Sequence, residues 1–405
     1  MRSREEFDNL ETAVIGAGNA GVLTIMHLLV KQEFRNITWY YDSTKPPVSV
    51  GEGSTIPQTQ LIASVLKFPN ELVRQEFRGS AKMGIDKINW GNGDFMHEFP
   101  TGQHAIHFSA NIMQDWFINN FEDDRLKKVD IQNLNPDDIK ADFIFDCSGK
   151  PKELDDKFEI VDTIPVNCAY IQQVPQTEKY PAFDKTYCIA RPFGWVFIIP
   201  LQDRYSIGYI YNKNINTEQE IAKDIENVYQ YVPSVKNISE GKVMPFDNYY
   251  RKENFKSNYV YNGNASFFME PLEATSSFNI VQINIFATEQ FHRPYSERKY
   301  NKQFSLEMLK NEFLINFHYM VGSKWKNDFW NEAYKKSMIT LDKFKEMGFG
   351  NVLNNIIAHT DMLNETKFFN KDAYRTIGQW PYASWVHHLR GFKIEDTIKD
   401  IWKLN

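Results

Sequence analysis

The sequence has few cysteines, no long apolar run and no excess of positive charge. Its three cysteines, Cys147, Cys168 and Cys188, form no C-x-x-C pair, which argues against a redox role and predicts reduced structural residues in a cytoplasmic protein. No run of about 18 apolar residues is present, so we expect no membrane span. The net charge of −6 argues against nucleic acid as the main partner, because phosphate binding requires a basic face.

Clear domain boundaries are also absent. No linker, repeat or low-complexity tract divides the 405 residues, which are enough for two domains or for one elaborate domain. Residues 1–6 are charged and lead directly into a predicted strand, so we expect no secretory signal. The hydrophobic content of 42% and the charged content of 24% are ordinary for a soluble globular protein. The aromatic content of 15% fits deep apolar pockets, and it fits an AT-rich coding sequence equally well.

The most informative local pattern is a glycine fingerprint near the N-terminus. A short apolar strand over residues 12–15 runs into a G-x-G-x-x-G turn made of Gly16, Ala17, Gly18, Asn19, Ala20 and Gly21. Apolar residues at helical spacing follow over residues 22–30, and a second strand over residues 37–41 ends at Asp42. This order of strand, glycine turn, helix, strand and acid predicts the first half of a dinucleotide-binding fold.

Each glycine of this fingerprint has its own physical role. Gly16 permits the tight turn, Gly18 lets the backbone approach a pyrophosphate, and Gly21 allows close packing of the helix on the strand. The helix N-terminus offers free N–H groups and a positive dipole end to the phosphates. Asp42 stands 21 positions after Gly21, where a carboxylate accepts hydrogen bonds from a ribose. An ordinary glycine-rich turn is the alternative.

The rest of the chain predicts an α/β (α+β) protein. Another buried-type strand covers residues 141–147, and alternating strand patterns follow over residues 160–174 and 194–211. From residue 282 onward the pattern is mostly helical. We therefore expect a discontinuous dinucleotide-binding module within residues 1–300 (about 8–92, 140–150 and 255–300). A β-sheet substrate region (about 93–139 and 151–254) is inserted into it, and residues 301–405 form a helical C-terminal cap.

Several segments, in this order along the chain, resemble flavin-dependent halogenases of the tryptophan halogenase type. Residues 50–57 (V-G-E-G-S-T-I-P) resemble the family segment V-G-E-A-T-I-P, and the spacing from Glu52 to Lys82 is without gaps. Residues 80–90 (S-A-K-M-G-I-D-K-I-N-W) are similar to the family's catalytic-lysine segment S-F/Y-K-x-x-I/V-x-F-x-N-W. The resemblance implies an FAD-binding module of the flavin monooxygenase and halogenase type.

Three later segments extend the same resemblance to about residue 330. Residues 193–200 (F-G-W-V-F-I-I-P) resemble G-W-x-W-x-I-P, with Phe197 at the position of the second tryptophan. Residues 270–276 (E-P-L-E-A-T-S) resemble E/D-P-L-E-S-T-G/S, and residues 313–319 with 328–330 resemble F-I-x-x-H-Y and its trailing F-W. The chain is shorter than typical tryptophan halogenases, and its composition is similar to that of compact virus-encoded members.

In this family reduced FAD, oxygen and a halide ion make hypohalous acid, which then travels to an aromatic substrate. The resemblance implies that Glu52, Gly53 and Ser277 contact the flavin. It implies that Trp195 and Phe197 form the wall between flavin and substrate. Phe197 keeps the bulk of a tryptophan but lacks its indole N–H.

The resemblance assigns catalysis to Lys82 and Glu273. Lys82 captures the hypohalous acid, as a haloamine or through a hydrogen bond, which requires a desolvated amine because desolvation favours the neutral form. Glu273 accepts the proton that leaves the ring or orients the lysine. Without the surrounding motifs, Lys82 is interpreted as a solvated surface lysine and Glu273 as a helix N-terminal carboxylate.

The halide site falls on Thr275 and Ser276, whose backbone amides stand near a helix start. The tryptophan enzymes usually have glycine at the position of Ser276. Because a serine side chain is larger, we expect bromide or iodide to be used at least as well as chloride.

The substrate side falls on His97 and Phe99, which resemble the family's x-H-x-F segment and flank an aromatic ring. The alternative is a loop histidine beside a core phenylalanine. Free tryptophan is a poor default because the C-terminal part differs, so we expect an indole, a phenol or a similar small aromatic.

We expect no metal site, because His104 with His107, and the pair His387 and His388, have no Cys or carboxylate at ligand spacing. Near the C-terminus, Trp380, Trp385 and the histidine pair are expected to pack the cap rather than bind a cofactor.

No second dinucleotide fingerprint for NAD(P)H is visible, which favours a separate NAD(P)H-dependent flavin reductase as partner. A homo-oligomer is left open. The expected location is the cytoplasm, or the host cytoplasm for a virus-encoded protein. Two other functions stay open: an FAD-dependent aromatic monooxygenase (hydroxylase), which needs neither halide nor Lys82, and a non-catalytic flavin-binding protein.

Overall fold

A computed structural model describes residues 9–31, 33–45, 52–66, 69–178, 181–233, 238–293, 297–366 and 376–402. The chain divides into two compact units. Unit 1 contains residues 1–81, 104–160 and 249–306, and unit 2 contains residues 82–103, 161–248 and 307–405. The mixed α/β class predicted from the sequence is confirmed.

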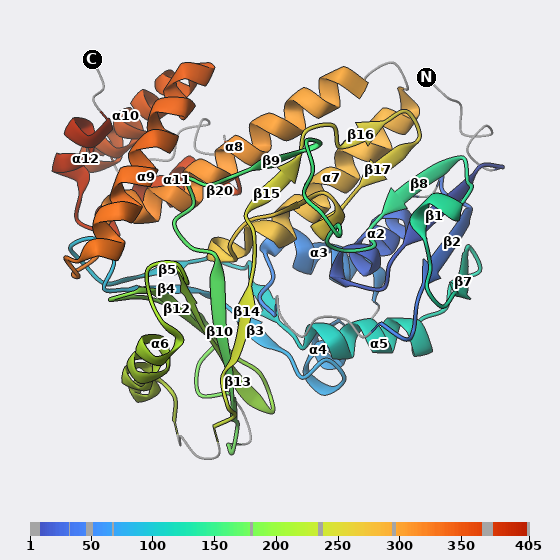
Figure 1. The fold of residues 1–405 in the computed structure, drawn as a ribbon, viewed down its shortest axis with the longest axis horizontal. Helices are drawn as coiled ribbons and strands as arrows, with labels where there is room; N and C mark the ends of the chain where they lie inside the picture. Colours follow the sequence, from blue (N-terminus) through green and yellow to red (C-terminus); the bar gives the residue numbers. More distant parts are fainter. Residues whose placement is uncertain are drawn as a thin grey trace. The chain divides into compact units, whose positions relative to one another are not determined.

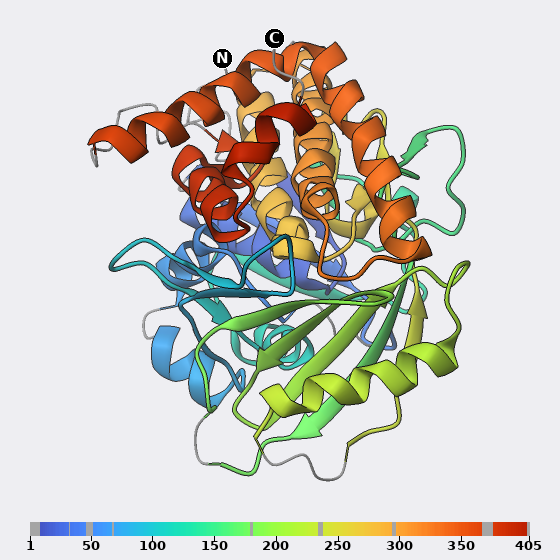
Figure 2. The same cartoon turned by 90° about the vertical axis from the view of Figure 1, so that its left-hand side faces the viewer.

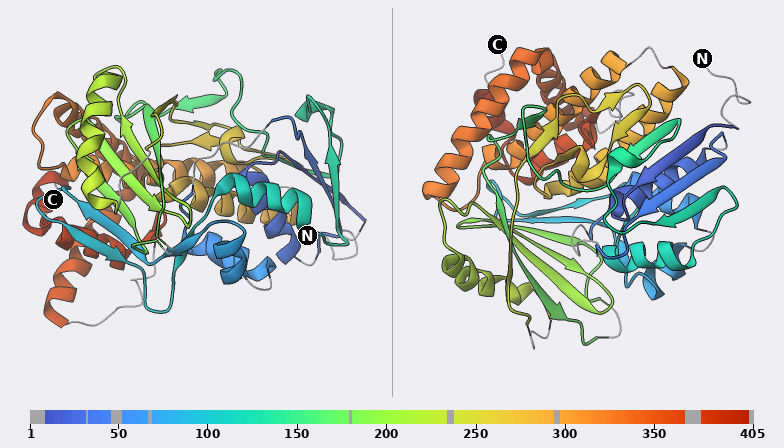
Figure 3. Two further views of the ribbon diagram at one scale, coloured as in Figure 1. Left: turned by 90° about the horizontal axis from the view of Figure 1, so that it is seen from below. Right: turned by 45° about the vertical axis from the view of Figure 1, so that its right-hand side comes forward.

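Unit 1 is built around a six-stranded sheet with the order β16-β17-β8-β1-β2-β7. Strands β17, β8, β1, β2 and β7 run parallel, and β16 is antiparallel at one edge. The strands that lie side by side in Figures 1 and 3 are β1 (Glu11–Ile15), β2 (Asn36–Tyr41), β7 (Leu126–Asp130), β8 (Phe143–Asp146), β16 (Phe255–Lys256) and β17 (Tyr259–Tyr261).

The predicted strand–turn–helix–strand unit is confirmed as β1, α2 (Asn19–Val30) and β2. Several boundaries differ from expectation. Residues 82–92, which we placed in the dinucleotide-binding module, belong to unit 2, and residues 104–139, 151–160 and 249–254, which we placed in the substrate region, belong to unit 1. For the segment 104–139 the cause is that β7 pairs with β2 in parallel register from Ile37 opposite Leu126. The physical reason is that a non-local strand pairing extends the parallel sheet.

The other elements of unit 1 cover the sheet or connect its strands. The helices are α3 (Ile56–Val65), α4 (Pro69–Gln75), α5 (Ala110–Asn120) and α7 (Thr275–His292), with short 3-10 turns at Pro136–Asp138, Gly263–Ala265 and Leu272–Ala274. The remaining strands are β6 (Ala105–His107), β9 (Phe158–Ile160), β15 (Tyr249–Arg251), β18 (Phe267–Phe268) and β3 (Ser80–Lys82), whose last residue, Lys82, is the first residue of unit 2. Helix α8 (Glu297–Val321) begins in unit 1 and continues into unit 2.

A buried polar network fastens α2 to α7. Asn262 donates from Nδ2 to Asn284 Oδ1 at 2.9 Å, and the Thr24 hydroxyl donates to the same oxygen at 3.0 Å. All three side chains are buried. Because a buried polar group is costly without its partner, this network favours one alignment of the two helices.

His27 is a second buried polar contact between α2 and α7, and it makes stability depend on pH. Its Nε2 lies 3.4 Å from Thr288 Oγ1. Burial, followed by the charge of Lys31, lowers the His27 pKa from 6.5 to about 4, against the opposing charge of Glu33. The folded protein therefore takes up this proton later than the unfolded chain does, and stability is lost as pH falls below 6.5.

We expect the free energy of unfolding to fall by about 3 kcal/mol more in the wild type than in His27→Gln between pH 7.5 and pH 4. Urea denaturation across that range measures the difference. His359→Gln, on helix α10 (Gly350–Thr366), is the matched control and should follow the wild type. Parallel curves for wild type and His27→Gln would contradict the assignment.

Unit 2 is built around a seven-stranded sheet with the order β14-β10-β13-β12-β11-β4-β5. All neighbouring pairs are antiparallel except β11 with β4, which run parallel. The strands are β4 (Gly84–Ile88), β5 (Phe95–Glu98), β10 (Cys168–Pro175), β11 (Thr186–Arg191), β12 (Gly194–Pro200), β13 (Arg204–Tyr211) and β14 (Lys242–Pro245). A core rich in Ile, Val and Tyr lies between this sheet and helix α6 (Glu218–Asp224) with the 3-10 helix Ile225–Tyr231, and Figure 2 shows α6 running along the strands.

The predicted helical C-terminus is confirmed. It contains α9 (Asp328–Phe344), the π-helix Lys345–Phe349, α10 (Gly350–Thr366), α11 (Tyr382–Gly391) and α12 (Glu395–Trp402), with a small hairpin of β19 (Thr376–Ile377) and β20 (Trp380–Pro381). Helix α7 begins at Thr275, ahead of the predicted residue 282. Among the helices of the described ranges, none is long and apolar enough to cross a membrane. The three cysteines are free and buried, as predicted.

Candidate functional site

The glycine turn of unit 1 contains two glycines that leave no room for a side chain and one that does. Gly16 has φ +109°, and a Cβ there would lie 2.2 Å from the Cys147 carbonyl oxygen; a Cβ on Gly21 would lie 2.1 Å from the carbonyl oxygen of Gly16. A Cβ on Gly18 would meet nothing within 4 Å among the described residues. Gly16 and Gly21 are therefore required by the fold itself, whereas the space beside Gly18 is available to a ligand.

The turn is held by hydrogen bonds to the neighbouring strand. The Gly16 N–H donates to the carbonyl of Tyr40 at 2.8 Å, and Trp39 Nε1 donates to the carbonyl of Gly16 at 2.9 Å. Gly18 is the N-cap of α2, and no side chain in the described structure caps this end of the helix. The first backbone N–H groups of α2, those of Asn19 and Ala20, thus suit an anionic group.

Three mutually packed helices of unit 1 begin with buried polar atoms that lack hydrogen-bond partners within the described residues. They are Asn19 Oδ1 in α2, both amide atoms of Gln58 in α3, and Thr275 Oγ1 in α7. A buried polar atom without a partner is costly, and each of these lies in the first turn of its helix, where the dipole end is positive. These atoms include acceptors (the amide oxygens of Asn19 and Gln58) and donors (the Gln58 NH₂ group and the Thr275 hydroxyl), and with the open space at Gly18 they fit a large polar ligand that offers both, such as a dinucleotide.

Glu52 and Gly53 lie on the segment that enters α3. Glu52 is buried and its carbonyl accepts from the N–H of Phe108 at 3.0 Å, while Gly53 forms an isolated antiparallel bridge with His107. The Ser54 hydroxyl donates to the carbonyl of Ile106 at 2.8 Å. Strand β6 therefore positions this segment. Residues 50 and 51 of the predicted motif lie outside the described residues.

Asp42 stands at the end of β2, as predicted, and its carboxylate organises the following turn. Oδ1 accepts from the hydroxyl and N–H of Thr44, and Oδ2 accepts from the N–H of Asn133 at 2.8 Å. The Thr44 hydroxyl, followed by these N–H groups, lowers the Asp42 pKa to about 2. A ribose contact stays a prediction.

The segment before α7 has an unusual backbone. Glu273 (φ 63°) and Ala274 (φ 56°) are two consecutive non-glycine residues in the left-handed region. Such conformations cost about 1–3 kcal/mol each and concentrate at functional sites. They turn the chain so that Thr275, Ser276 and Ser277 begin α7, with Thr275 and Ser277 buried and Ser276 half-buried. Successive N–H groups after such a turn suit an anion.

In unit 2, the structure brings Lys82, His97 and Phe99 together. Lys82 is buried, 3% exposed, and its Nζ lies 5.7 Å from the centre of the Phe99 ring. The His97 and Phe99 rings meet edge to face at 6.1 Å, and His97 Nε2 lies 3.1 Å from Ser384 Oγ of α11. The interpretation of Lys82 as a solvated surface lysine is wrong. His97 lies on strand β5 and contacts a C-terminal helix, so the alternative of a loop histidine beside a core phenylalanine is wrong for His97.

The same region contains residues that we did not predict as site residues. His388 stacks on Trp380 with ring centres 3.6 Å apart, and lies 4.3 Å from His97. His318 meets Trp380 edge to face at 5.4 Å, and the buried Lys87 Nζ lies 3.0 Å from His318 Nε2. We call His97, His318, His388, Phe99 and Trp380 the histidine cluster.

A signal for these residues was present in the sequence. Lys87 stands where the lysine segment that it resembles has phenylalanine. The His387–His388 pair was expected to pack the cap. Trp385 does so, with Phe317 at 4.9 Å, but His388 on the same helix joins the cluster.

Trp195 and Phe197 lie two residues apart on β12 and therefore share one face of the sheet. Their ring centres are 6.1 Å apart. The Phe197 ring covers Gly208 on the neighbouring strand, where an added Cβ would lie 2.1 Å from the ring. This glycine gives the aromatic pair its place on the sheet.

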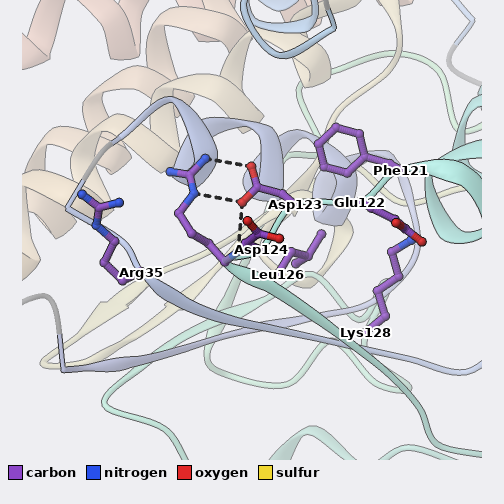
Figure 4. A pocket seen from close by; sticks show the side chains of 8 residues that line it. Arg35, Phe121, Glu122, Asp123, Asp124, Leu126 and Lys128 are labelled. Carbon is purple, nitrogen blue, oxygen red and sulfur yellow. Dashed lines mark hydrogen bonds and ion pairs between the residues drawn. The ribbon is translucent and has the colours of Figure 1, made fainter.

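The predicted site residues do not line the open depression on unit 1 that Figure 4 shows. That depression, about 780 Å³, is lined by charged and apolar side chains: Arg35, Phe121, Glu122, Asp123, Asp124, Arg125, Leu126 and Lys128. Arg125 Nε lies 2.9 Å from Asp123 Oδ1, so part of its charge is paired internally. This depression contains none of the predicted site residues and has no part in the candidate site.

Unit 1 thus has the form of a dinucleotide-binding fold, and unit 2 adds a buried lysine beside a histidine cluster. The family model for tryptophan halogenases matches residues 11–135 and 114–380. The chain belongs to the tryptophan halogenase family, and the resemblance inferred from its motifs is confirmed.

Individual relatives are distant and longer. Tryptophan 7-halogenase RebH of Lentzea aerocolonigenes is 23% identical over 256 residues, 56% of this chain and 48% of RebH. 7-chloro-L-tryptophan 6-halogenase KtzR of Kutzneria sp. (strain 744) is 27% identical over 213 residues, 48% of this chain and 40% of KtzR. The matches span about half or less of these curated relatives.

Solved structures confirm the fold over nearly the whole chain. BrvH, a flavin-dependent halogenase from Brevundimonas sp. BAL3, superimposes with a TM-score of 0.73 at 20% identity, covering 95% of this chain and 90% of BrvH. Xcc4156, a flavin-dependent halogenase from Xanthomonas campestris, has a TM-score of 0.74 at 17% identity, covering 95% of this chain and 89% of that protein.

Proposed function

We propose that this protein is a flavin-dependent halogenase that acts on a small aromatic molecule such as an indole or a phenol. The observation that carries the proposal is Lys82: an amine only 3% exposed, beside Phe99 and the histidine cluster, in the segment that resembles the family's catalytic-lysine segment. Family membership supplies the reaction type.

Unit 1 holds FAD in this proposal. Gly16 to Gly21 with Asp42, Glu52, Gly53 and Ser277 bind the dinucleotide. The open space at Gly18 supports this assignment, as do the buried atoms of Asn19 and Gln58 that have no hydrogen-bond partner in the described part of the chain. Reduced FAD with oxygen and halide supplies hypohalous acid. A separate NAD(P)H-dependent reductase supplies the reduced flavin, and both act in the cytoplasm, that of the host for a virus-encoded protein.

Lys82 and Glu273 carry the reaction in this proposal. The Lys82 amine binds hypohalous acid and presents the halogen to the substrate, which His97 and Phe99 flank. The carbon–halogen bond forms as the bond that held the halogen to oxygen or to the Lys82 nitrogen breaks. The hypohalous oxygen takes one proton from Lys82 and leaves as water, and the ring proton passes to Glu273, which returns it to Lys82. Trp195 and Phe197 exclude the substrate from the flavin side.

Thr275 and Ser276 bind the halide through their N–H groups in this proposal. The left-handed pair Glu273 and Ala274 supports an anion-binding turn at this point. Ser276 is half-buried, and partial burial costs a strongly hydrated chloride more than it costs a larger, weakly hydrated halide. We therefore expect bromide or iodide product to equal or exceed chloride product.

One incubation tests both statements. The protein is mixed with FAD, a flavin reductase, NADH, oxygen, an aromatic panel and equal concentrations of the three halides, and products are identified by mass. Halogenated product that disappears without halide supports the halogenase, and dominance of the chlorinated product overturns the halide preference. Oxygen-only mass shifts that persist without halide indicate the hydroxylase, and bound FAD without any product indicates a non-catalytic flavin-binding protein.

A further inference from the structure

The histidine cluster of unit 2 contains a buried acceptor atom that the reaction above does not use. His388 is fully buried, and its Nδ1 lies 2.7 Å from the carbonyl of Ser384. A carbonyl only accepts, so Nδ1 carries the proton and Nε2 of the neutral ring is an acceptor. Nε2 is buried and has no hydrogen-bond partner within the described residues.

The surroundings keep this ring neutral. Burial, followed by His97, Lys87 and His318, lowers the His388 pKa well below its usual range. These groups come from β5, β4 and α8, and the Ser384 carbonyl on α11 opposes them. The next residue, His387, also has its pKa lowered by burial, against Glu98 and with the help of Arg390.

Lys87 and a backbone carbonyl determine which nitrogen of the neighbouring His318 ring carries the proton. His318 Nδ1 lies 3.0 Å from the carbonyl of Leu314, so Nδ1 donates and Nε2 accepts from Lys87 Nζ at 3.0 Å. The acceptor of His318 is thus already occupied by a protein donor. His388 is left as the acceptor that a bound molecule can use.

The position of His388 suits a ring that is held next to Lys82. The His97 ring centre lies 4.3 Å from that of His388 and 6.1 Å from that of Phe99, and Lys82 Nζ lies 5.7 Å from the centre of the Phe99 ring. Trp380 at 3.6 Å from His388 supplies a further aromatic face. An aromatic ring against His97 therefore lies near both the halogen-carrying amine and the free acceptor.

We propose that His388 Nε2 accepts a hydrogen bond from the N–H or O–H of the substrate. The enzyme then selects indoles and phenols over aromatic rings of the same shape that lack a donor. This inference rests on the proposed function for the identity of the ligand as a small aromatic molecule. Discrimination arises because a donor-free ring leaves the buried acceptor unpaired.

Binding of indole and of its donor-free isostere benzofuran tests the proposal. Calorimetry on the protein loaded with oxidised FAD, without halide or reductant, gives both dissociation constants while no turnover occurs. We expect indole to bind at least about tenfold more tightly than benzofuran in the wild type. In His388→Phe, which keeps an aromatic ring but removes the acceptor, we expect the ratio to fall to about one.

His359→Phe is the matched control. His359 also places its Nδ1 against the carbonyl four residues earlier, 2.7 Å from Asn355 O, but it stands on α10 beside Tyr382. This variant should keep the wild-type ratio. In the wild type alone, the ¹⁵N signal of His388 Nε2 should shift with indole and stay unchanged with benzofuran, which tests the proposal even if His388→Phe fails to fold.

Equal affinities, no binding of either ring, or a ratio that survives in His388→Phe overturns the proposal. Halogenation is assayed separately. Halide-dependent product with no discrimination in binding leaves the halogenase proposal standing while this inference fails. If the protein discriminates between the two rings in binding but makes no halide-dependent product, the role of His388 stands and the halogenase proposal fails.

Discussion

Replacing Lys82 by methionine or alanine lowers halide-dependent product formation by at least about 10³-fold and leaves FAD affinity unchanged within about twofold. The large effect is expected because no other group in the proposed reaction presents the halogen to the ring. FAD affinity is spared because the proposed flavin residues belong to unit 1, whereas Lys82 begins unit 2. Methionine has similar length and suits a site that is 3% exposed, so folding is retained.

The measurement is single-turnover product yield by mass spectrometry, alongside flavin fluorescence for FAD binding. Lys335→Ala is the matched control, since the Lys335 side chain is 74% exposed. It should behave as the wild type. Halogenated product that persists in Lys82→Met would show that the halogen reaches the substrate without the amine. Hydroxylated product that persists would favour the monooxygenase.

The local part of the fold could be predicted from the sequence. The glycine turn and its flanking elements lie within residues 11–41, and each is determined by contacts between near neighbours. Strand β7 could not be placed in the same way. Its sequence L-K-K-V-D alternates weakly, and only its parallel pairing with β2, about 90 residues earlier, defines its role.

The start of α7 was missed for a different reason. Thr275, Ser276 and Ser277 are poor helix formers and follow two left-handed residues, so the helical pattern became visible only later in the chain. Propensity describes the average preference of a residue, whereas the turn at Glu273 and Ala274 is a tertiary feature.

In the candidate site, too, residues close in sequence could be predicted, whereas a residue brought there by tertiary packing could not. Lys82, His97 and Phe99 are close in sequence, and a motif could identify them together. His388 lies 291 positions after His97, and its stacking on Trp380 depends on α11 docking against β5. A sequence pattern registers the His387–His388 pair but contains no information about that docking.

The glycine turn yields the second large effect, because two similar substitutions should have opposite consequences. Gly18→Ala places a methyl group where no described atom lies within 4 Å, at a φ of −70° that alanine adopts readily. We expect the free energy of unfolding without FAD to change by less than about 1 kcal/mol. FAD affinity should fall at least about tenfold, because the methyl group enters the space through which the backbone approaches the pyrophosphate.

Gly21→Ala should instead damage the protein itself. Its methyl group would lie 2.1 Å from the Gly16 carbonyl oxygen, a backbone atom that can move only if the helix and strand separate. We expect a loss of about 3 kcal/mol of stability even without FAD. Gly350→Ala, on α10 with open space around it, is the control and should change neither quantity. Urea denaturation of the FAD-free protein and flavin titration separate the two effects. If Gly18→Ala binds FAD as tightly as the wild type, the pyrophosphate does not lie at this turn, since a ligand in contact with that backbone cannot ignore an added methyl group.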